Sequence, residues 1–476
     1  MNNVNTVRVK MWGTTIGYLH QDDNGMVGFQ YDDEFLKSNI EVSPIKMPLS
    51  SITYSFPSLP EQTYHGLPGM VADSLPDRFG NIVINRYLES QGRTADDLSV
   101  IEKLCYTGKR GMGALEYEPS QEVVNINEKV DLDALTKLAS EILSEKEKIH
   151  IEKNDNLMAQ LMECGSSVGG ARAKTLIAWN PETNDIRSGQ VDAGDGYEYW
   201  LLKFDNIKNN KDKDARPDDG EYTKVEYAYY LMALDAGIEM SECRLYKENG
   251  SAHFMTKRFD RKGKNGEKLH MQSLCALAHM DFNSPRVYSY EEAFVVMKQL
   301  KLPYSDFIQL FKRMVFNEFA KNYDDHTKNI SFLMDKKGNW SLSPAYDVTF
   351  SYRKDSIWVK AHQMLINGKS DNITEDDILQ VAEKAGIKKS DAVKCIEQVK
   401  QSVSKWEMDQ ALPQLDKVLH LCKLFDISAD KLLFEDISKM FEKQEKNGKN
   451  KYFGTDGFRG EVNRDLTSDQ AYKVGR

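Results

Sequence analysis

The chain lacks any apolar run long enough to cross a membrane, and its opening residues, Met1-Asn2-Asn3-Val4, lack the basic and apolar segments of a signal peptide. Its six cysteines are scattered without a C-x-x-C pair, so neither a zinc site nor a disulfide framework is expected. The formal net charge of −10 argues against a basic field over the whole surface, although it allows a local basic cleft. We therefore expect a cytoplasmic protein with reduced cysteines and no membrane partner.

With 476 residues, the chain is longer than one ordinary domain and can bury a substantial core. From 7 to 119, short bursts of alternating apolar and polar residues predict a small mixed α/β unit with a helix over 81–90. A charged helical connector over 132–148 then leads into a second region.

The stretch Tyr323-Asp324-Asp325-His326-Thr327-Lys328-Asn329 is typical of the catalytic loop of phosphoryl-transfer enzymes. Asp324 and Asn329 are five positions apart, which is the spacing of the catalytic Asp and the metal-binding Asn in protein kinases. An apolar helical segment over 307–319 leads directly into this stretch. On spacing alone, a polar run of this kind is more often a solvated loop than a catalytic one.

A second carboxylate follows where a hairpin could return it to the first. Residues 330–334 and 340–342 predict two strands joined by a tight turn that contains Gly338, and the chain then reaches Pro344-Ala345-Tyr346-Asp347. In kinases, one Asp orients or deprotonates the acceptor hydroxyl, while Asn and a second Asp hold the magnesium that bridges the phosphates. The two segments together therefore indicate kinase-like chemistry.

Upstream elements complete the order found in kinases. They are a glycine-containing loop over 165–174, a strand carrying Lys203, a helix over 223–236 with Glu226 in its first turn, and a strand over 253–261 where a kinase hinge would fall. Amides of the loop could wrap phosphate oxygens, with Arg172 and Lys174 adding charge, although the loop is not a Walker A motif. Taken singly, the glycines fit an ordinary turn. Lys203 alone fits a lysine that protects an edge strand against aggregation. The order is more specific than any one of its members.

These residues together resemble the HipA-type toxin kinases, the serine/threonine kinase halves of bacterial toxin–antitoxin pairs. The resemblance covers about 7–406 and is carried by Ser74-Leu75-Pro76-Asp77, Ser167-Val168-Gly169-Gly170-Ala171, Leu202-Lys203-Phe204, Lys257-Arg258-Phe259-Asp260-Arg261, Asp324-x-His326-x-Lys328-Asn329 and Tyr346-Asp347. It implies a two-lobed, protein-kinase-like α+β fold. The expected parts are a small N-terminal mixed α/β subdomain at 1–130, an N-lobe-like region with phosphate loop and hinge at 131–262, and a mostly helical C-lobe at 263–406.

The resemblance also implies roles for individual residues. Asp324 would be the catalytic base, Asn329 and Asp347 the Mg²⁺ ligands, and Lys203 the partner of the ATP phosphates. The implied ATP-binding residues are Val168, Gly169, Gly170, Ala171, Arg172, Lys174, Lys203, Lys257, Arg258, Phe259, His326 and Lys328, with 257–259 contacting adenine at the hinge. One departure from the family is the loop Gly169-Gly170-Ala171-Arg172, where an Ala-Gly-Ala-Gln-like sequence is usual.

Ser167 matches the serine that this family autophosphorylates in trans, which moves the phosphate loop away and inactivates the enzyme. A phosphoryl group there would add close to two negative charges beside a site built for an anion. The alternative is that Ser167 is a small polar turn residue.

The family implies an XRE-family, HipB-like antitoxin as partner and, through it, operator DNA. By analogy the protein substrate is an aminoacyl-tRNA synthetase, although no residue here selects one. A different function class is a DNA-associated transcriptional regulator that acts with an XRE-type antitoxin partner, against which the acidic net charge weighs. A third reading, a catalytically dead interaction protein, is disfavoured by the intact set Lys203, Asp324, Asn329 and Asp347.

Beyond 406 the sequence changes character. Residues 402–434 resemble the second half of an XRE-type helix-turn-helix domain, with 401–406 ending its recognition helix, or they form an amphipathic helical extension. This extension and a polar linker fill 407–450, and 451–476 resemble the N-terminal fragment of a phosphoglucosamine mutase. Because no residues of a mutase site follow, we expect no such activity and interpret the tail as a chimeric or mis-joined segment.

Overall fold

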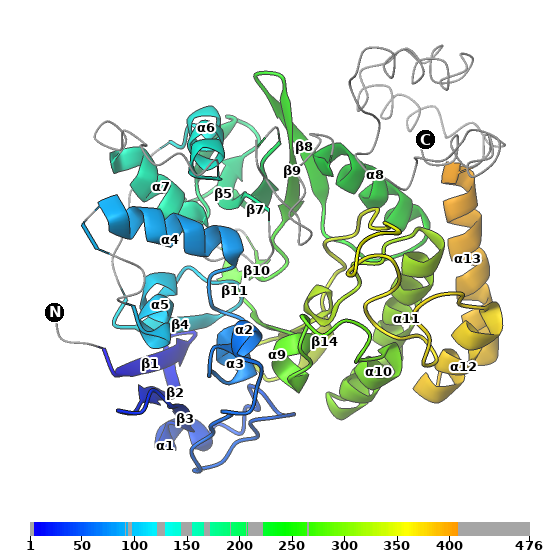
Figure 1. Cartoon of the computed structure of the whole chain (residues 1–476), viewed down its shortest axis with the longest axis horizontal. Coiled ribbons are helices and arrows are strands. Elements are labelled where there is room, and N and C mark those ends of the chain that lie inside the picture. The colour runs from blue at the N-terminus through cyan, green and yellow to red at the C-terminus, as the bar shows by residue number, and fades with distance from the viewer. Residues whose placement is uncertain are drawn as a thin grey trace.

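The chain folds into an N-terminal subdomain, a lobe built on a five-stranded sheet and a helical lobe (Figure 1). The computed structural model describes residues 4–90, 92–93, 98–120, 129–143, 155–165, 172–190, 192–205, 207, 222–263 and 266–407. Among the helices of these ranges, none has the length and hydropathy needed to cross a membrane. Four cysteines in these ranges, Cys105, Cys243, Cys275 and Cys395, are buried free thiols. The sequence predicts such reduced, buried cysteines.

The N-terminal subdomain is built on an antiparallel sheet with the strand order β3-β2-β1-β4. Its strands are β1 (Thr6–Met11), β2 (Thr14–Gln21), β3 (Val27–Tyr31) and β4 (Leu115–Glu118). Short helices accompany it: α1 (Asp33–Leu36), α2 (Glu61–Tyr64), α3 (Gly69–Ala72) and α5 (Val100–Thr107). Along β1, Val7, Val9 and Met11 are buried while their neighbours are more exposed. The alternation in the sequence thus predicts correctly which side chains enter the core.

The second part is a lobe whose antiparallel sheet has the strand order β6-β5-β7-β9-β8. The strands are β5 (Lys174–Asn180), β6 (Asp185–Ser188), β7 (Glu198–Lys203), β8 (Cys243–Glu248) and β9 (Ser251–Lys257). The helices are α4 (Arg78–Ser90), α6 (Leu132–Leu143), α7 (Asp155–Gly165) and α8 (Tyr222–Asp235). Phe79 and Val83 of α4 share a hydrophobic core with Trp200 and Met255 of the sheet. The helix α4, which lies alongside α7 in Figure 1, therefore packs into this lobe.

The third part is mostly helical and holds the largest hydrophobic core of the described residues. Its helices are α9 (Leu274–Ala278), α10 (Tyr290–Gln299), α11 (Tyr304–Phe319), the 3₁₀ turn η3 (Thr327–Asn329), α12 (Glu375–Ala385) and α13 (Lys389–Glu407). A sheet of order β12-β13-β14 and a ribbon of β10 and β11 adjoin them. These strands are β10 (Arg261–Lys262), β11 (Glu267–Lys268), β12 (His270–Ser273), β13 (Ser331–Met334) and β14 (Trp340–Leu342).

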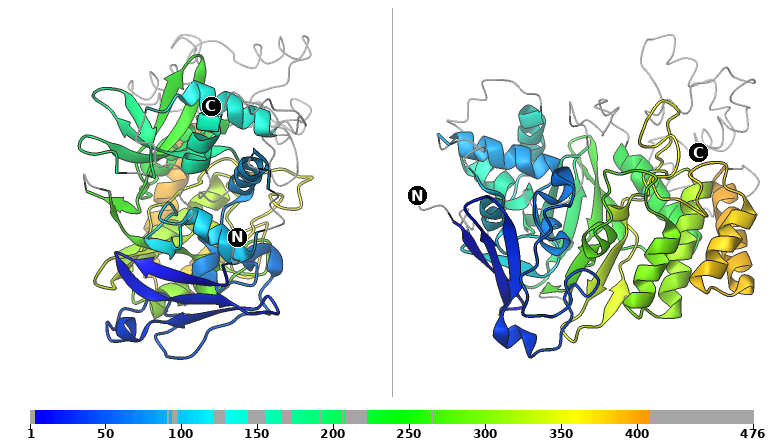
Figure 2. Two further views of the ribbon diagram at one scale, coloured as in Figure 1. Left: turned by 90° about the vertical axis from the view of Figure 1, so that its left-hand side faces the viewer. Right: turned by 60° about the horizontal axis from the view of Figure 1, so that its bottom comes forward.

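Local signals in the third part agree with the structure. The expected hairpin is β13 and β14, and Gly338 in its turn has a φ of +85°, which suits glycine. Thr374 and Asp377 form the expected capping box of α12, which ends at Gly386 in the left-handed conformation. The right-hand panel of Figure 2 shows α12 and α13 at the far edge of the helical lobe from the N-terminal sheet.

The segment expected to end a recognition helix, 401–406, instead forms the last turns of α13. Ser402 Oγ donates a hydrogen bond to the Met232 carbonyl of α8 at 3.2 Å, and Trp406 Nε1 donates to Asp235 Oδ2 at 2.9 Å. These contacts hold the segment against α8 of the second lobe, so it does not project as a separate helix. The linker and the mutase-like segment lie outside the described residues.

Candidate active site

The catalytic loop follows α11, and its last residue, Asn329, forms hydrogen bonds back to earlier residues of the loop. Asn329 donates its backbone N–H to the His326 carbonyl and its Nδ2 to the Asp324 carbonyl, each at 2.8 Å. The side chain of Asp324 is 38% exposed, so the carboxylate can be reached from solvent. Because Nδ2 of Asn329 is used within the loop, its Oδ1 is the atom suited to bind a cation.

The hairpin returns Asp347 to the catalytic loop. The Tyr346 hydroxyl lies 2.5 Å from both the Lys328 carbonyl and Ser331 Oγ, which ties the residue before Asp347 to the catalytic loop and to β13. Asp347 itself has a φ of +52°, in the left-handed region that residues other than glycine seldom adopt. Such strained conformations concentrate at functional sites, and here one accompanies the expected metal-binding Asp.

Lys203 joins Asp347 to the five-stranded sheet. Its Nζ lies 2.6 Å from Glu226 Oε1 of α8 and also contacts Asp347 Oδ1. The helix begins at Tyr222, so Glu226 lies just beyond the first turn in which the sequence placed it. Burial works to lower the pKa of Lys203, but Asp347 and Glu226 outweigh it and raise this pKa. Burial works to raise the pKa of Asp347, but Lys203 outweighs it and lowers this pKa to about 2. The Lys–Glu pair expected from the sequence is therefore present, with Asp347 ionised at neutral pH.

The phosphate-loop side of the site is described only in part, since Ser167, Val168, Gly169, Gly170 and Ala171 lie outside the described residues. The Arg172 guanidinium sits 3.1 Å from the centre of the Tyr222 ring. Lys174 is buried beside Lys203 of the neighbouring strand, and its Nζ lies 3.7 Å from Asp77 Oδ2. Burial is the main cause that raises the pKa of Asp77 to about 6, and Lys174 opposes it. The Lys174 side chain thus engages the segment that precedes α4.

The hinge side chains point in different directions. Lys257 Nζ pairs with Glu198 Oε1 at 2.6 Å, whereas the fully buried Arg258 binds Asp260. The Phe259 ring lies 5.5 Å from the Tyr346 ring, next to the residue that precedes Asp347. The buried ion pair leaves the Arg258 side chain unable to reach a nucleotide, so an Arg258 contact would have to come from its backbone.

His326 and Lys328 lie on the catalytic loop near an aromatic ring. His326 Nε2 is 3.9 Å from Asp324 Oδ1, and the His326 and Phe282 ring centres are 5.4 Å apart. Lys328 Nζ lies 4.7 Å from the centre of the same Phe282 ring. Phe282 thus supports both of these expected ATP-binding side chains.

A buried polar cluster that no sequence motif indicates contacts the catalytic loop. We call it the catalytic-loop network and define it as Asp325, His362, Glu318, Tyr290 and Gln363. Gln363 Nε2 donates a hydrogen bond to Asp324 Oδ1, and the imidazole of His362 lies between two carboxylates. The segment that carries residues 362 and 363 is irregular and has no motif, so only the fold could reveal the cluster.

Two family models match the chain, the HipA N-terminal domain over residues 7–118 and the HipA-like C-terminal domain over residues 166–406. The second match alone spans more than half of the chain. This chain belongs to the HipA family. The resemblance drawn from the sequence motifs is confirmed.

Among solved structures, the chain is similar to HipA of Shewanella oneidensis MR-1, determined with HipB and operator DNA. The TM-score is 0.59 at 15% identity, and the match covers 90% of this chain and 96% of that one. At this identity the likeness concerns the fold, and it confirms the expected two-lobed, kinase-like architecture. The Helicobacter pylori proinflammatory kinase CtkA also matches, at 11% identity over 44% of this chain and 87% of that one, with a TM-score of only 0.26.

A short stretch matches an unrelated enzyme. Over 26 residues the chain is 77% identical to phosphoglucosamine mutase of Lachnoclostridium phytofermentans, which is 6% of this chain and 6% of the mutase. A match of that length does not contain an active site, so it assigns no mutase activity to this HipA-family chain.

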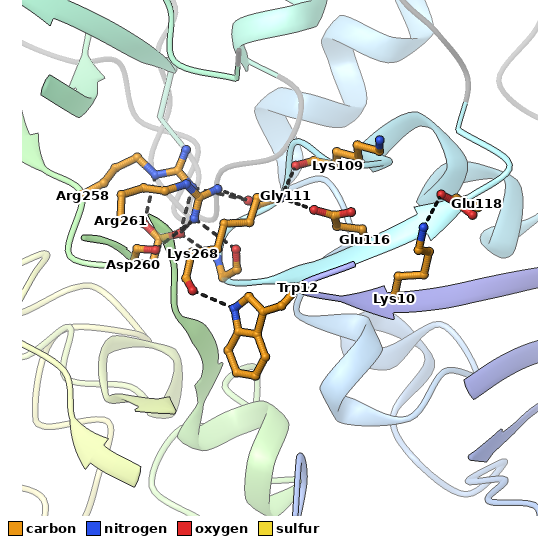
Figure 3. A network of polar contacts seen from close by, with 11 residues as sticks. Lys10, Trp12, Lys109, Gly111, Glu116, Glu118, Arg258, Asp260, Arg261 and Lys268 are labelled. Carbon is orange, nitrogen blue, oxygen red and sulfur yellow. Dashed lines mark hydrogen bonds and ion pairs between the residues drawn. The ribbon is translucent and has the colours of Figure 1, made fainter. Parts of the chain in front are cut away.

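A second buried network connects the N-terminal subdomain of this HipA-family chain to the hinge (Figure 3). We call it the interdomain network and define it as Arg258, Asp260, Arg261 and the backbone of residues 111–113. Asp260 Oδ2 accepts hydrogen bonds from Gly113 N–H at 2.7 Å, Arg258 Nη2 at 2.8 Å and Arg261 Nη1 at 2.7 Å. At its border, Lys268 Nζ pairs with Glu116, and Trp12 Nε1 donates to the Lys268 carbonyl at 2.7 Å. The hinge is thereby fixed to the loop that precedes β4.

Proposed function

We propose that this chain is an ATP- and Mg²⁺-dependent serine/threonine protein kinase, acting in the cytoplasm as the toxin of a type II toxin–antitoxin module. The observation that carries the proposal is the convergence of Lys203, Glu226 and Asp347, tied through Tyr346 to the loop that holds Asp324 and Asn329. A lysine paired with a helix glutamate, together with an Asp and an Asn near the catalytic Asp, is the set that phosphoryl transfer requires.

The residues present fit a nucleotide with magnesium. Asp347 and Asn329 offer hard oxygen donors, the kind of ligand that Mg²⁺ prefers, and the carboxylate of Asp347 is ionised because its pKa is lowered to about 2. Lys203, oriented by Glu226, offers an ammonium group to the phosphates. When bound, Mg²⁺ would neutralise phosphate charge. We further propose ATP contacts from Val168, Gly169, Gly170, Ala171, Arg172, Lys174, Lys257, Arg258, Phe259, His326 and Lys328.

Asp324 supplies the acid–base step. Its carboxylate accepts the proton of the acceptor hydroxyl as the hydroxyl oxygen bonds to the γ-phosphorus and the bond from that phosphorus to the ADP oxygen breaks. The 38% exposure of the side chain lets an acceptor from another protein reach it. The acceptor belongs to a cytoplasmic protein, by family analogy an aminoacyl-tRNA synthetase, and Ser167 is the proposed site of autophosphorylation.

Partners are proposed from the structural relative. That relative was solved with HipB and operator DNA, so we propose a HipB-like antitoxin of the XRE family, and operator DNA through it. The same observation favours the second candidate function, a transcriptional regulator that acts with such an antitoxin. Operator binding by the antitoxin with and without this chain, using wild type and Asp324→Ala, separates regulation from catalysis.

Two alanine variants test the kinase proposal. Asp324→Ala should lower phosphorylation by roughly 10²–10⁴-fold while Mg-ATP still binds, because only the base is lost. Asp347→Ala should weaken Mg-ATP binding as well, because a metal ligand is lost. Phosphoryl transfer to acceptor proteins and calorimetric titration of Mg-ATP measure the two effects. Full activity in either variant would contradict the assignment.

A further inference from the structure

Gln363 is fixed beside the expected catalytic base by its backbone as well as its side chain. Its backbone N–H donates to Asp325 Oδ1 at 2.8 Å, and its carbonyl accepts from the Arg286 N–H at 2.6 Å. Its side chain is buried, and Nε2 donates to Asp324 Oδ1. The residue therefore reaches two consecutive carboxylates of the catalytic loop with two different donors.

The orientation of this amide is determined by its neighbours. Gln363 Oε1 is buried and accepts no hydrogen bond from any residue that the structure describes. Turning the amide over would place this oxygen against the Asp324 carboxylate, and two acceptors cannot bond to each other. The NH₂ group must consequently face Asp324, even though the buried oxygen costs about 1–3 kcal/mol.

The neighbouring residue holds the other carboxylate. His362 Nδ1 lies 2.7 Å from Asp325 Oδ2 and its Nε2 lies 2.9 Å from Glu318 Oε2, so both ring nitrogens serve as donors. The Tyr290 hydroxyl donates to Asp325 Oδ2 at 2.9 Å. With both of its oxygens engaged, Asp325 cannot turn, and it in turn holds the backbone N–H of Gln363.

We propose that Gln363 is a positioning residue for Asp324, with His362 acting through Asp325 to hold Gln363 in place. The inference deepens the kinase function proposed above and depends on it. The amide occupies Oδ1 of Asp324, the same oxygen that faces His326 at 3.9 Å. Oδ2 is thereby directed to the acceptor hydroxyl, and the carboxylate no longer rotates freely between unproductive positions.

The test uses variants of Gln363 in the full chain. Gln363→Met keeps the size and backbone bonds but removes the donor, and Gln363→Glu also places a negative charge beside Asp324. We expect kcat to fall about 10-fold in the first and more in the second, with the Kd for Mg-ATP unchanged, because the amide serves the base and not the nucleotide. The matched control is Gln380→Met, which removes two exposed hydrogen bonds, one donated to Asp376 and one accepted from Asn367, and should leave kcat unchanged.

A double-mutant cycle separates positioning from general structural support. If Gln363 acts through Asp324, Gln363→Met should cost nothing further once Asp324→Asn is present, whereas a structural defect would lower the residual rate in both backgrounds. Wild-type kcat for Gln363→Met, or an equal loss in both backgrounds, would overturn the inference and leave the kinase assignment intact. A wild-type chain without phosphoryl transfer would instead overturn the proposed function. If Gln363→Met lowers the melting temperature, the inference is tested by the kcat of Gln363→Glu. An unchanged Kd for Mg-ATP in Gln363→Met would show that its nucleotide site is still folded.

Discussion

The two buried polar networks differ in the kind of charge they contain. The interdomain network balances Asp260 against two arginines, Arg258 and Arg261, whose charges are permanent at physiological pH. The catalytic-loop network places one imidazole, that of His362, between Asp325 and Glu318. The first contains no imidazole, while the second contains one and also contacts the expected base. We therefore expect the first to govern stability alone and the second to influence both stability and catalysis.

Position along the chain sharpens the difference. Asp260 joins the hinge to Gly113, 147 residues earlier, and so connects two parts of the molecule. Burial would raise the pKa of Asp260, but Arg258 and Arg261 outweigh it and hold this pKa well below its usual value. Burial would likewise lower the pKa of His362, but Asp325 and Glu318 raise it to about 9. At pH 7 the His362 imidazole and both arginines are therefore charged. As pH rises, His362 loses its charge first, because burial lowers the pKa of Arg261 only to about 10.

The largest expected effect comes from breaking the interdomain network. Asp260→Ala should lower the free energy of unfolding by roughly 3–5 kcal/mol, because it leaves two buried arginines without their carboxylate. Urea unfolding followed by circular dichroism measures the loss. The control is Glu34→Ala, which removes an exposed ion pair with Lys37 and should change stability by less than about 1 kcal/mol. Equal stability of the two variants would show that the network does not hold the hinge.

A smaller effect is expected from titrating the catalytic-loop network. The folded pKa of His362 is about 9, above the ordinary 6.5, so its contribution is fully present below pH 6.5 and is lost as pH rises through 9. The linkage amounts to on the order of 3 kcal/mol. Unfolding free energies of wild type and His362→Gln, compared from pH 6 to pH 9.5, should converge as pH rises.

His270 provides the opposite case for the same measurement. It is buried, no described carboxylate contacts it, and burial lowers its pKa to about 4. Its neutral form is the stable one, so the His270 contribution to stability is present above pH 6.5 and is lost as pH falls toward 4.

The His362 prediction is contradicted if the difference in unfolding free energy between wild type and His362→Gln stays constant across pH 6–9.5. Such a result would mean that the pKa of His362 is not raised in the folded protein.

The sequence predicts the elements whose signals are local. Gly338 predicts the hairpin turn, Thr374 predicts the start of α12, and the position of Glu226 near the start of its helix predicts its pairing with Lys203. Contacts between distant irregular segments have no such signal. Gln363 meets Asp324 from 39 residues away, and Arg258 turns toward the N-terminal subdomain although its motif suggests a nucleotide contact.

The same reason explains the recognition-helix interpretation of 401–406. An apolar stripe on a helix shows that one face is buried but does not identify what covers it. In this chain, the buried residues Ser402 and Val403 lie in α13, which packs on α8 and α11. The pattern was therefore a property of the helical lobe and not of a DNA-reading domain.

The smallest expected effect comes from shortening the chain after this helix. A chain that ends at Glu407 should match the full chain in unfolding free energy and autophosphorylation, because every element of the site and both networks precede this residue. A chain that ends at Gln401 loses the buried Val403 and the Trp406–Asp235 hydrogen bond, and should lose about 1.5–3 kcal/mol from Val403 alone. Thermal melts and a phosphorylation assay compare the three chains. A loss on ending at Glu407 as large as that at Gln401 would mean that residues beyond α13 pack on the kinase-like lobes, and the tail could then no longer be interpreted as a mis-joined segment.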